Sequence, residues 1–198
     1  SCLAAPHGPL VHSLLRCGSP ESRAAPMKVA ITGAFSYSGR YLAKLLLDGG
    51  HQVVSLSSRF APIAAAPLTS RDVDSVEKHP LDFSDEKRLG TALEGCSVLW
   101  CTYWIRFEKD GDTFAAAADR CKRLFEIARQ AGVRRIVYTS HTHATEASPF
   151  VYIAGKARAA AALRASGIGS YAIARPCGIF GDTAGESILM NNAAWVLR

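Results

Sequence analysis

Residues 28–56 have the sequence KVAITGAFSYSGRYLAKLLLDGGHQVVSL, and this stretch decides the fold. An apolar run at 29–31 predicts a short strand, and the spacing of the apolar residues that follow predicts an amphipathic helix at 40–48. The glycine pair at 49–50 indicates the end of that helix, and the run at 52–56 is typical of a second strand. A strand, a helix and a strand in this order predict a βαβ unit with parallel strands.

The turn at 32–39, between the first strand and the helix, is built from small residues. A helix N-terminus binds anions because its first N–H groups have no partner inside the helix and the helix dipole is positive there. Glycine at positions 33 and 39 lets a pyrophosphate approach the backbone closely. The alternative is an ordinary tight strand-to-helix turn. The predicted dinucleotide contacts are Gly33, Ser36, Tyr37, Ser38, Gly39 and Arg40.

The pattern T-G-x-x-S-x-x-G at 32–39 resembles the T-G-x-x-G-x-x-G turn of the extended and atypical short-chain dehydrogenase/reductase family. Ser36 stands where that family usually has its middle glycine, so it narrows the space above a pyrophosphate but can donate its hydroxyl to it. The resemblance covers residues 28–198. It implies an α/β Rossmann fold with a doubly wound parallel sheet, a bound NAD(P) and chemistry like that of NAD-dependent epimerases and dehydratases.

The composition is that of one globular domain. The 198 residues are 48% hydrophobic and 20% charged, which is enough apolar material for a sizeable core. No apolar run approaches the ~20 residues of a membrane-spanning helix, so no span is expected. The net charge of +6 is scattered; it favours an anionic ligand, but it does not form the basic stripe typical of nucleic-acid binding, which we do not expect. The sequence does not indicate an oligomeric state.

The six cysteines lack the C-x-x-C spacing of a redox or metal motif. We therefore expect reduced thiols, mostly buried as small apolar side chains. His141 and His143 form an H-x-H pair, but no cysteine or carboxylate cluster lies near them in the sequence. No metal site is expected.

The two ends of the chain suggest a fragment. Residues 1–26 contain one acidic residue and are rich in Ala, Ser, Pro and Leu, which is typical either of an organellar transit peptide, for a plastid for example, or of a disordered leader. Without a transit peptide the expected location is the cytoplasm. The first methionine is Met27, and the chain stops at Arg198 within an apolar stretch that would need a further partner. We expect a Rossmann domain at 27–198 that includes only the start of a substrate region.

The second predicted strand is followed by Ser57, Ser58 and Arg59. In NAD-binding sites an acidic residue near this point accepts hydrogen bonds from the ribose hydroxyls, and none is present here. A guanidinium matches a phosphate in bidentate geometry, so Arg59 suits the 2′-phosphate of NADP(H). The sequence predicts a preference for NADP(H) over NAD(H), with a solvated loop arginine as the alternative.

The rest of the chain alternates helices and strands, apart from residues 61–74, which are expected to form a loop. The expected elements are a helix at 85–93, a strand at 98–101, a helix from 112 or 113 to 132, a strand at 134–140, a helix capped by Ser148, a strand at 170–174 and a substrate-region helix from Asn191.

The segment L-D-F-S-D at 81–85 resembles a family element that brackets the adenine ring. The resemblance implies that Asp82 binds the adenine amino group and that Phe83 lies on its face. Alternatively, Asp82 or Ser84 caps the following helix, since short polar side chains are preferred there.

The resemblance implies two more cofactor contacts. Thr102 ends an apolar strand that passes beneath the ribose and pyrophosphate, and the bulky Tyr103 and Trp104 that follow would either line the substrate side or fill the site. The loop at 175–181 resembles the family pattern R-P-x-x-φ-φ-G, which places Pro176 beside the nicotinamide.

Tyr152 and Lys156 form a Y-x-x-x-K motif, the catalytic signature of the family. Residues four apart share one helix face, so both side chains can meet one ligand. An ammonium near the phenol would lower the pKa of Tyr152 from its reference of about 10 and fit it for proton exchange with a substrate oxygen. By resemblance, Lys156 also holds the nicotinamide ribose.

The third member of this group is open among Ser140, His141 and Thr142. Counting along the family pattern places His141 at the commonest serine position, yet we predict Ser140 as the residue that orients the substrate oxygen, with Thr142 second. The sequence thus predicts an NADP(H)-dependent oxidoreductase, epimerase or dehydratase acting at a hydroxyl or carbonyl carbon. The alternative is a non-catalytic dinucleotide-binding scaffold, such as an organellar assembly or redox-sensing factor.

Overall fold

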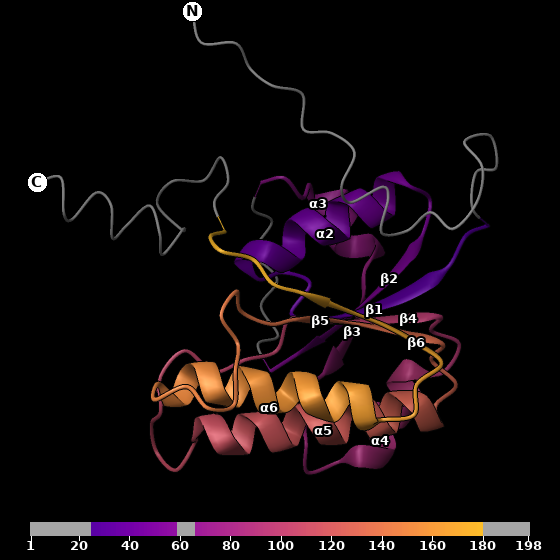
Figure 1. Cartoon of the computed structure of the whole chain (residues 1–198). Coiled ribbons are helices and arrows are strands. Elements are labelled where there is room, and N and C mark those ends of the chain that lie inside the picture. Colours follow the sequence, from indigo (N-terminus) through magenta and orange to yellow (C-terminus); the bar gives the residue numbers. More distant parts are fainter. Residues whose placement is uncertain (1–24, 59–65, 180–198) are drawn as a thin grey trace, which may run out of the picture.

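The computed structural model describes residues 25–58 and 66–179, which form a six-stranded parallel sheet between two layers of helices (Figure 1). The strands lie in the order β3-β2-β1-β4-β5-β6. The strands are β1 (Lys28–Thr32), β2 (Gln52–Ser57), β3 (Glu77–Pro80), β4 (Val98–Cys101), β5 (Arg135–Thr139) and β6 (Ser170–Ala174). The helices are α2 (Tyr37–Asp48), α3 (Ser70–Ser75), α4 (Glu86–Leu93), α5 (Phe114–Gln130) and α6 (Val151–Ala165).

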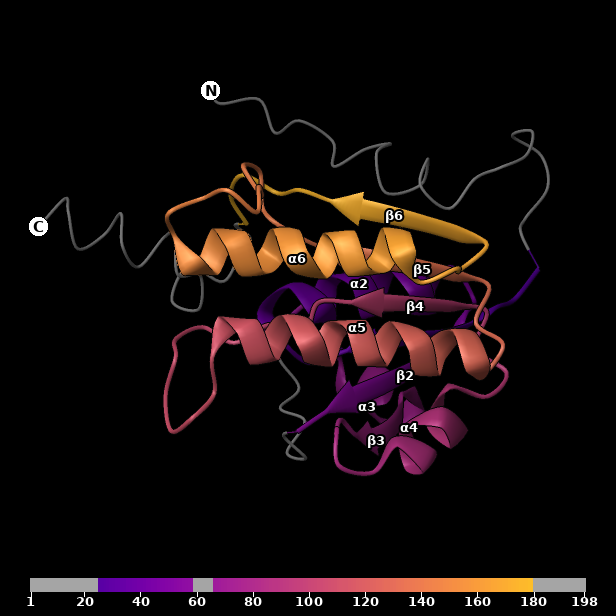
Figure 2. The same cartoon turned by 60° about the horizontal axis from the view of Figure 1, so that its bottom comes forward.

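Helices cover both faces of the sheet. Figures 1 and 2 show α2 and α3 on one face and α4, α5 and α6 on the other. Successive strand residues point to opposite faces, so Val29 and Ile31 pack in the core under α2, whereas Ala30 packs in the core under α5. The central strands are therefore buried on both sides, which is why their sequences are continuous apolar runs. The predicted α/β fold with a doubly wound parallel sheet is confirmed.

The strand order reverses between β1 and β4. The chain runs outward from β1 to β2 and β3, and then returns to β4 on the other side of β1. The loops that leave β1 and β4 therefore diverge, and in sheets of this topology the ligand-binding crevice is expected at the carboxyl ends of these two strands. The turn at 33–36 and residue Thr102 lie at this point.

Most element predictions agree with the structure to within a few residues, and the strands at 98–101 and 170–174 agree completely. The expected start of α2 at Arg40 was wrong, because Ser36 caps a helix that begins at Tyr37. The loop predicted at 61–74 was wrong in its last part, where Thr69 and Asp72 form a reciprocal capping box at the start of α3. Six residues are too few to show helical periodicity, so the apolar pattern could not indicate this helix.

Two cap predictions were also wrong. Helix α4 is capped by Asp85, which accepts a hydrogen bond from Arg88 N, whereas Asp82 and Ser84 bond to each other. The N-cap of α6 is Phe150, which makes no side-chain cap bond. Ser148 instead accepts from Phe150 N two residues ahead, because a serine hydroxyl can close a local turn as readily as it caps a helix.

Several expectations concern residues outside the described ranges: the leader at 1–26 apart from its last two residues, Arg59, and the substrate-region helix from Asn191. Within the described part, no helix is both long and apolar enough to cross a membrane. The same part contains Cys96, Cys101, Cys121 and Cys177 as free thiols, and the first three are buried.

Candidate cofactor and active site

The turn after β1 brings the backbone of two glycines into contact. Gly33 has a φ of +74°, and a Cβ on Gly39 would lie 2.0 Å from the carbonyl oxygen of Gly33. No side chain fits at position 39 unless the turn moves, so helix α2 can begin directly against the strand end. The bare, close turn that the sequence predicted is present.

Ser36 acts within this turn. Its hydroxyl accepts a hydrogen bond of 3.2 Å from Gly39 N, and its N–H donates to the Gly33 carbonyl at 2.9 Å. The main-chain N–H groups of Tyr37 and Ser38 donate to no acceptor among the described residues. Two N–H donors at the start of α2, those of Tyr37 and Ser38, therefore remain for an anion. A third, that of Gly39, is already bonded to the Ser36 hydroxyl.

Arg40 and Tyr37 lie on the first turn of α2. The guanidinium of Arg40 is buried, 5.3 Å from the ring centroid of Tyr37 and 5.8 Å from that of Tyr41. The Tyr37 hydroxyl is buried and has no hydrogen-bond partner among the described residues. The positive charge of Arg40 thus lies immediately beside the turn.

The ends of β1 and β4 are tied together by two threonines. The hydroxyl of Thr32 accepts from Thr102 N at 2.7 Å and from Tyr103 N at 2.8 Å, and the Thr102 hydroxyl donates to the Thr32 carbonyl. Thr102, a predicted cofactor contact, therefore has both its N–H and its hydroxyl engaged by β1. This clamp sets the geometry of the crevice floor where the strand order reverses.

The predicted adenine-binding pair lies beside this floor. Asp82 is exposed and accepts two hydrogen bonds from Ser84, which lower the pKa of its carboxyl group. Phe83 packs on Tyr103 with ring centroids 5.0 Å apart, and Tyr103 accepts a hydrogen bond from Arg120 on α5. The ring of Tyr103 is held by these neighbours on the α5 side of the sheet.

Lys156 lies on α6 at the carboxyl end of β5. Its ammonium donates to the Thr139 carbonyl at 2.8 Å, and it lies 4.5 Å from the ring centroid of Trp104 and 5.2 Å from that of Tyr138. Thr139 O is its one hydrogen-bond acceptor within the described part of the chain. Burial lowers the pKa of Lys156 to about 8 from its ordinary 10.5, and the nearby thiols of Cys121 and Cys101 oppose this shift.

Tyr152, one helical turn before Lys156, is enclosed by rings. The centroids of Phe114, Trp104 and His141 lie 5.3, 6.0 and 6.0 Å from its own, and all three contacts are edge-to-face. Burial raises the pKa of Tyr152. The expectation that Lys156 would lower this pKa is wrong for the structure, because the apolar rings remove water from the phenol and thereby disfavour the phenolate.

The segment after β5 carries the candidates for the third group. Ser140 is 5% exposed; its N–H donates to Ala174 O at 2.8 Å, and its hydroxyl has no partner among the described residues. His141 is half-buried, and its buried Nδ1 also lacks a partner there. Thr142 is half-buried, and the side chain of this segment whose ring contacts that of Tyr152 is His141.

Two residues that shape this corner were missed as site residues. A Cβ on Gly155 would lie 3.1 Å from the carbonyl oxygen of Phe114 and 3.2 Å from Cζ2 of Trp104. Glycine thus lets α6 approach the start of α5 and the Trp104 ring. A glycine directly before Lys156 in a predicted helix is the signal that could have indicated this contact. Phe114 was expected only as a core residue of its helix.

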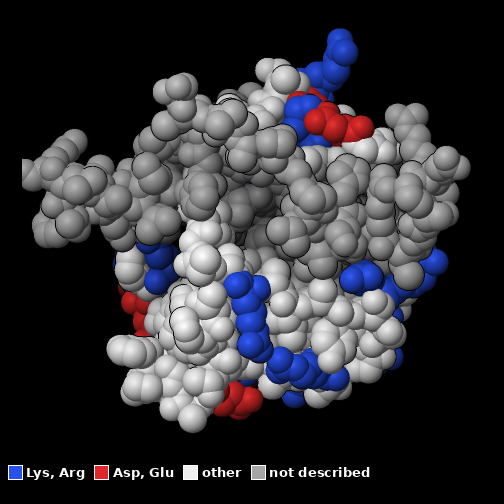
Figure 3. Space-filling view, turned by 45° about the horizontal axis from the view of Figure 1, so that its top comes forward, with Lys and Arg blue, Asp and Glu red and all other residues white. Residues whose placement is uncertain are grey.

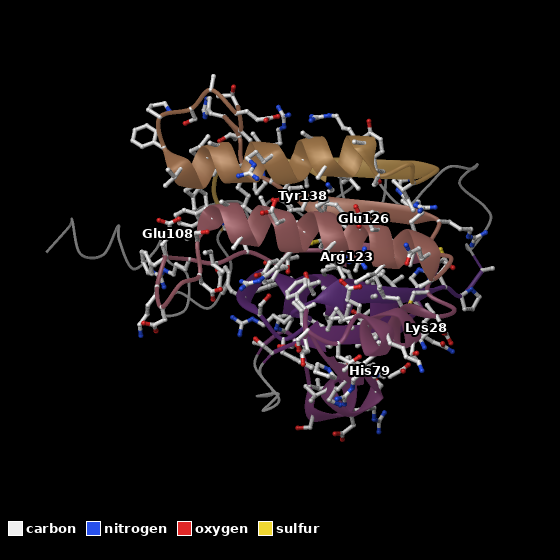
Figure 4. All side chains as sticks on the ribbon, turned by 90° about the horizontal axis from the view of Figure 1, so that it is seen from below. Lys28, His79, Glu108, Arg123, Glu126 and Tyr138 are labelled. Atoms are coloured by element: carbon white, nitrogen blue, oxygen red, sulfur yellow. The ribbon has the colours of Figure 1, made fainter. Side chains whose placement is uncertain are left out.

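The floor of this corner belongs to the main core. Tyr138, labelled in Figure 4, lies between α5 and α6, and its buried hydroxyl has no partner among the described residues. Glu108, also labelled, accepts a hydrogen bond from Phe114 N at 2.9 Å and so fixes the start of α5. On the outer side, Arg123 joins α5 to Glu86 of α4. The bond to Glu108 therefore ties the segment that follows Trp104 to the start of α5.

Neither the surface charge nor the surface grooves indicate where the cofactor binds. In Figure 3, lysine and arginine side chains lie in several groups on the face shown, and the largest group forms a short run at the lower centre. A groove of ≈ 410 Å³ lies between α5 and α6, where Arg158 and Asp119 form an ion pair of 3.2 Å. That groove is on the outer surface of the helices, so the bare turn and the strand ends are better indicators of the cofactor position. No group of three or more metal-binding side chains occurs within the described ranges.

Comparison with known proteins decides the family. A family model described as NAD(P)H-binding matches residues 33–194. The chain belongs to this NAD(P)H-binding family. The match begins at the first glycine of the turn and includes the whole Y-x-x-x-K helix.

Two curated relatives of this NAD(P)H-binding chain are bacterial. Sterol demethylase protein B of Methylococcus capsulatus is 32% identical over 126 residues, which cover 62% of this chain and 37% of that protein. The 3-beta-hydroxysteroid dehydrogenase of Mycolicibacterium neoaurum is 28% identical over 132 residues, which cover 62% of this chain and 34% of that protein. The chain spans roughly a third of the length of these relatives.

Solved structures show the same fold. Triphenylmethane reductase of Citrobacter sp., complexed with NADP(H), superposes with a TM-score of 0.58 at 22% identity over 77% of this chain and 50% of that one. The Bordetella bronchiseptica enzyme WbmH, in complex with NAD+, gives a TM-score of 0.61 at 15% identity over 86% of this chain and 64% of that one. The two neighbours hold different dinucleotides, so they do not decide which of the two this chain prefers.

The residues of this chain fit a dinucleotide. The turn offers the N–H groups of Tyr37 and Ser38 beside a glycine pair that leaves no side chain in the way. At the other end of the crevice, Lys156 has donors to spare. Nδ1 of His141, beside the Tyr152 ring, is buried without a partner in the described part of the chain. Polar atoms buried in this way are expected to meet a ligand or water.

Proposed function

We propose that this chain is the cofactor-binding part of an NADP(H)-dependent oxidoreductase or epimerase that acts at a hydroxyl or carbonyl carbon. The observation that carries the proposal is the position of Lys156, a buried ammonium one helical turn from Tyr152 at the carboxyl end of β5, with one acceptor among the described residues. Burying an ammonium group costs free energy, and ionisable side chains with strongly shifted pKa values are concentrated at functional sites. The match to an NAD(P)H-binding family supports a role for Lys156 in binding that cofactor.

Each side chain has a defined task in this proposal. The spare N–H groups of Lys156 hold the ribose next to the nicotinamide, which supplies or accepts a hydride when it is bound. Tyr152 gives its phenolic proton to the carbonyl oxygen of the substrate during reduction and takes it back during oxidation. A raised pKa keeps the phenol of Tyr152 protonated at neutral pH, which suits the role of proton donor.

The preference for NADP(H) rests on the sequence that follows β2. The strand ends at Ser57, and neither Ser58 nor Arg59 offers a carboxylate to the ribose hydroxyls. We expect NADPH to bind at lower concentration than NADH in a calorimetric titration. Arg59→Ala should remove that difference, whereas Arg106→Ala, the control at an exposed arginine of the described part of the chain, should preserve it. Equal affinities in the unmodified protein would contradict the role assigned to Arg59.

The names of two relatives supply a substrate class to test first. One is named a steroid dehydrogenase and the other a sterol demethylase protein, so 3β-hydroxysteroids are the first substrates to test. We expect NADP+-dependent oxidation by the full-length protein, and we expect Tyr152→Phe to abolish turnover while cofactor affinity stays within about twofold. Turnover that survives in Tyr152→Phe would refute the proton-transfer role.

A non-catalytic dinucleotide-binding scaffold is the second candidate. The observation in its favour is that Trp104 lies on the Lys156 ammonium and against Tyr152, so the chain's own aromatic rings cover the two reactive side chains. If this candidate is correct, NADPH binds but no hydroxysteroid is oxidised, and Trp104→Ala does not create activity. If instead the chain is part of an enzyme, Trp104 moves when the substrate binds or forms part of the wall of the substrate site.

A further inference from the structure

His141 is the polar side chain that meets Tyr152. Their ring centroids are 6.0 Å apart and the planes are 84° from parallel, so the edge of one ring faces the other. The other two ring neighbours of Tyr152 come from the region between β4 and α5: Trp104 lies after β4, and Phe114 begins α5. Of the three neighbours, the imidazole alone can both donate and accept a hydrogen bond.

Ser140 is less suited to reach a substrate. Its N–H extends the ladder between β5 and β6 by bonding to Ala174 O, so the residue is held in the sheet. The side chain is 5% exposed, whereas His141 is half-buried and lies beyond the ladder. Of these two residues, His141 is therefore the one whose side chain contacts Tyr152 and is less deeply buried.

Nδ1 of His141 is available to hydrogen-bond a ligand. This nitrogen is buried, and no described residue offers it a hydrogen bond. A buried polar atom without a partner costs roughly 1–3 kcal/mol. The carbonyl or hydroxyl oxygen of a substrate beside the Tyr152 phenol would provide that partner.

Building on the proposed function, we propose that His141, rather than Ser140, is the catalytic residue that hydrogen-bonds the substrate oxygen opposite Tyr152. During reduction the imidazole N–H donates to the carbonyl oxygen and stabilises the negative charge that develops there, while Tyr152 supplies the proton that completes the alcohol. The imidazole gains and loses no proton in the overall reaction. The active group is then His141, Tyr152 and Lys156.

Three variants separate the hydrogen bond from the packing. His141→Phe keeps a ring against Tyr152 but has no donor, so kcat/KM for a 3β-hydroxysteroid should fall by roughly 10²–10³, the usual loss of one donor to a developing oxyanion. His141→Asn places an amide nitrogen near the position of Nδ1 and should recover all but about tenfold of the activity. Ser140→Ala should change kcat/KM by less than about threefold.

Ligand binding tests the contact without turnover. The 3-keto steroid androstenedione and NADP+ are both oxidised, so together they form a complex that cannot react. In that complex the ¹⁵N signal of His141 Nδ1 should shift when the ketone is added, and ketone affinity measured by calorimetry should fall about tenfold in His141→Phe, as expected for one hydrogen bond. Ser140→Ala should bind the ketone as the unmodified protein does.

The outcomes are distinct from those that test the function itself. Equal ketone affinity in the unmodified protein and in His141→Phe, with no shift of Nδ1, overturns the assignment of His141. A 100-fold loss of kcat/KM in Ser140→Ala with an active His141→Phe also overturns it and returns the role to Ser140. By contrast, turnover in Tyr152→Phe refutes the proposed proton transfer by Tyr152. It does not affect the ketone-binding measurement, which tests His141 independently.

Discussion

The two ends of the crevice are held in different ways. The turn between β1 and α2 is shaped by the backbone: Gly33 and Gly39 touch, and the Ser36 hydroxyl caps the helix within three residues. The corner between β5 and α6 is shaped by side chains from distant segments, where Trp104 and Phe114 close around the reactive group. A site formed by local backbone geometry can be predicted from a short stretch of sequence. A site formed by side chains that are distant in sequence cannot.

The largest effect that this comparison predicts is at Gly39. Because a Cβ there would lie 2.0 Å from Gly33 O, even Gly39→Ala must open the turn and displace the N–H groups that we propose bind the pyrophosphate. Losing two hydrogen bonds to a charged group lowers cofactor affinity by roughly 100-fold or more. Calorimetric titration with NADPH measures this loss.

Gly90→Ala is the matched control, since a Cβ at that position in α4 meets only Ile127 Cγ2, at 3.9 Å. It should leave cofactor affinity unchanged. If Gly39→Ala still binds NADPH normally while circular dichroism shows an intact fold, the pyrophosphate lies elsewhere.

The same contrast explains what could be predicted from the sequence. The fold was predictable because each central strand is a short apolar run and each long helix has an apolar face, so local patterns and burial agree. The bare turn at Gly33 and Gly39 was predictable for the same reason. Helix α3 was not, because its stability comes from the capping box of Thr69 and Asp72 in a segment without periodicity.

The corner between β5 and α6, where we propose the active site, was only partly predictable. The spacing of Tyr152 and Lys156 placed both on one helix, but the direction of the Tyr152 pKa shift depends on Trp104 and Phe114. Those residues are 48 and 38 positions away in sequence, and no local pattern says that they enclose the phenol. For the same reason the sequence favoured Ser140, while the ring contact with Tyr152 belongs to His141.

The second prediction uses the buried charge at this corner. Lys156 has a pKa of about 8 in the folded protein and an ordinary value of 10.5, so between these values the unfolded chain binds more protons than the folded one. Stability therefore rises with pH through this window and is lowest below it. Relative to Lys156→Met, which lacks the charge, the unmodified protein should gain about 2 kcal/mol between pH 7 and pH 9.5.

Urea unfolding of both proteins at the two pH values measures this gain. Taking the difference between them cancels the other groups that titrate, including Cys96, whose pKa burial raises to about 11. Lys122→Met, at an exposed position of α5, is the control and should show no such change. A constant difference between the unmodified protein and Lys156→Met would show that Lys156 is solvated.

The third prediction concerns the close approach of α6 to the rings. Gly155→Ala adds a methyl group 3.1 Å from Phe114 O and 3.2 Å from Trp104 Cζ2, so the helix or the indole must shift. Overpacking of this kind costs 1–3 kcal/mol and outweighs the gain of about 1 kcal/mol in helix propensity, so we expect a net loss of about 1 kcal/mol. Gly90→Ala should instead stabilise the protein by about 0.5–1 kcal/mol, because it gains propensity without a clash. Thermal unfolding measures both effects. A lower melting temperature for Gly155→Ala and a higher one for Gly90→Ala would confirm that α6 is close-packed against Phe114 and Trp104, and equal shifts would contradict it.

The smallest effect is expected at Ser36, and it sharpens the comparison most. If the backbone alone shapes the turn, the serine contributes only its cap to Gly39 N. Ser36→Ala should then cost about 1 kcal/mol of stability and Ser36→Gly only a few tenths, because glycine leaves the helix start open to water. Cofactor affinity should stay within about threefold in Ser36→Gly, since the N–H groups of Tyr37 and Ser38 remain in place. A tenfold loss of NADPH affinity in Ser36→Gly would mean that the hydroxyl contacts the phosphate directly, and then the turn, like the corner, depends on a side chain.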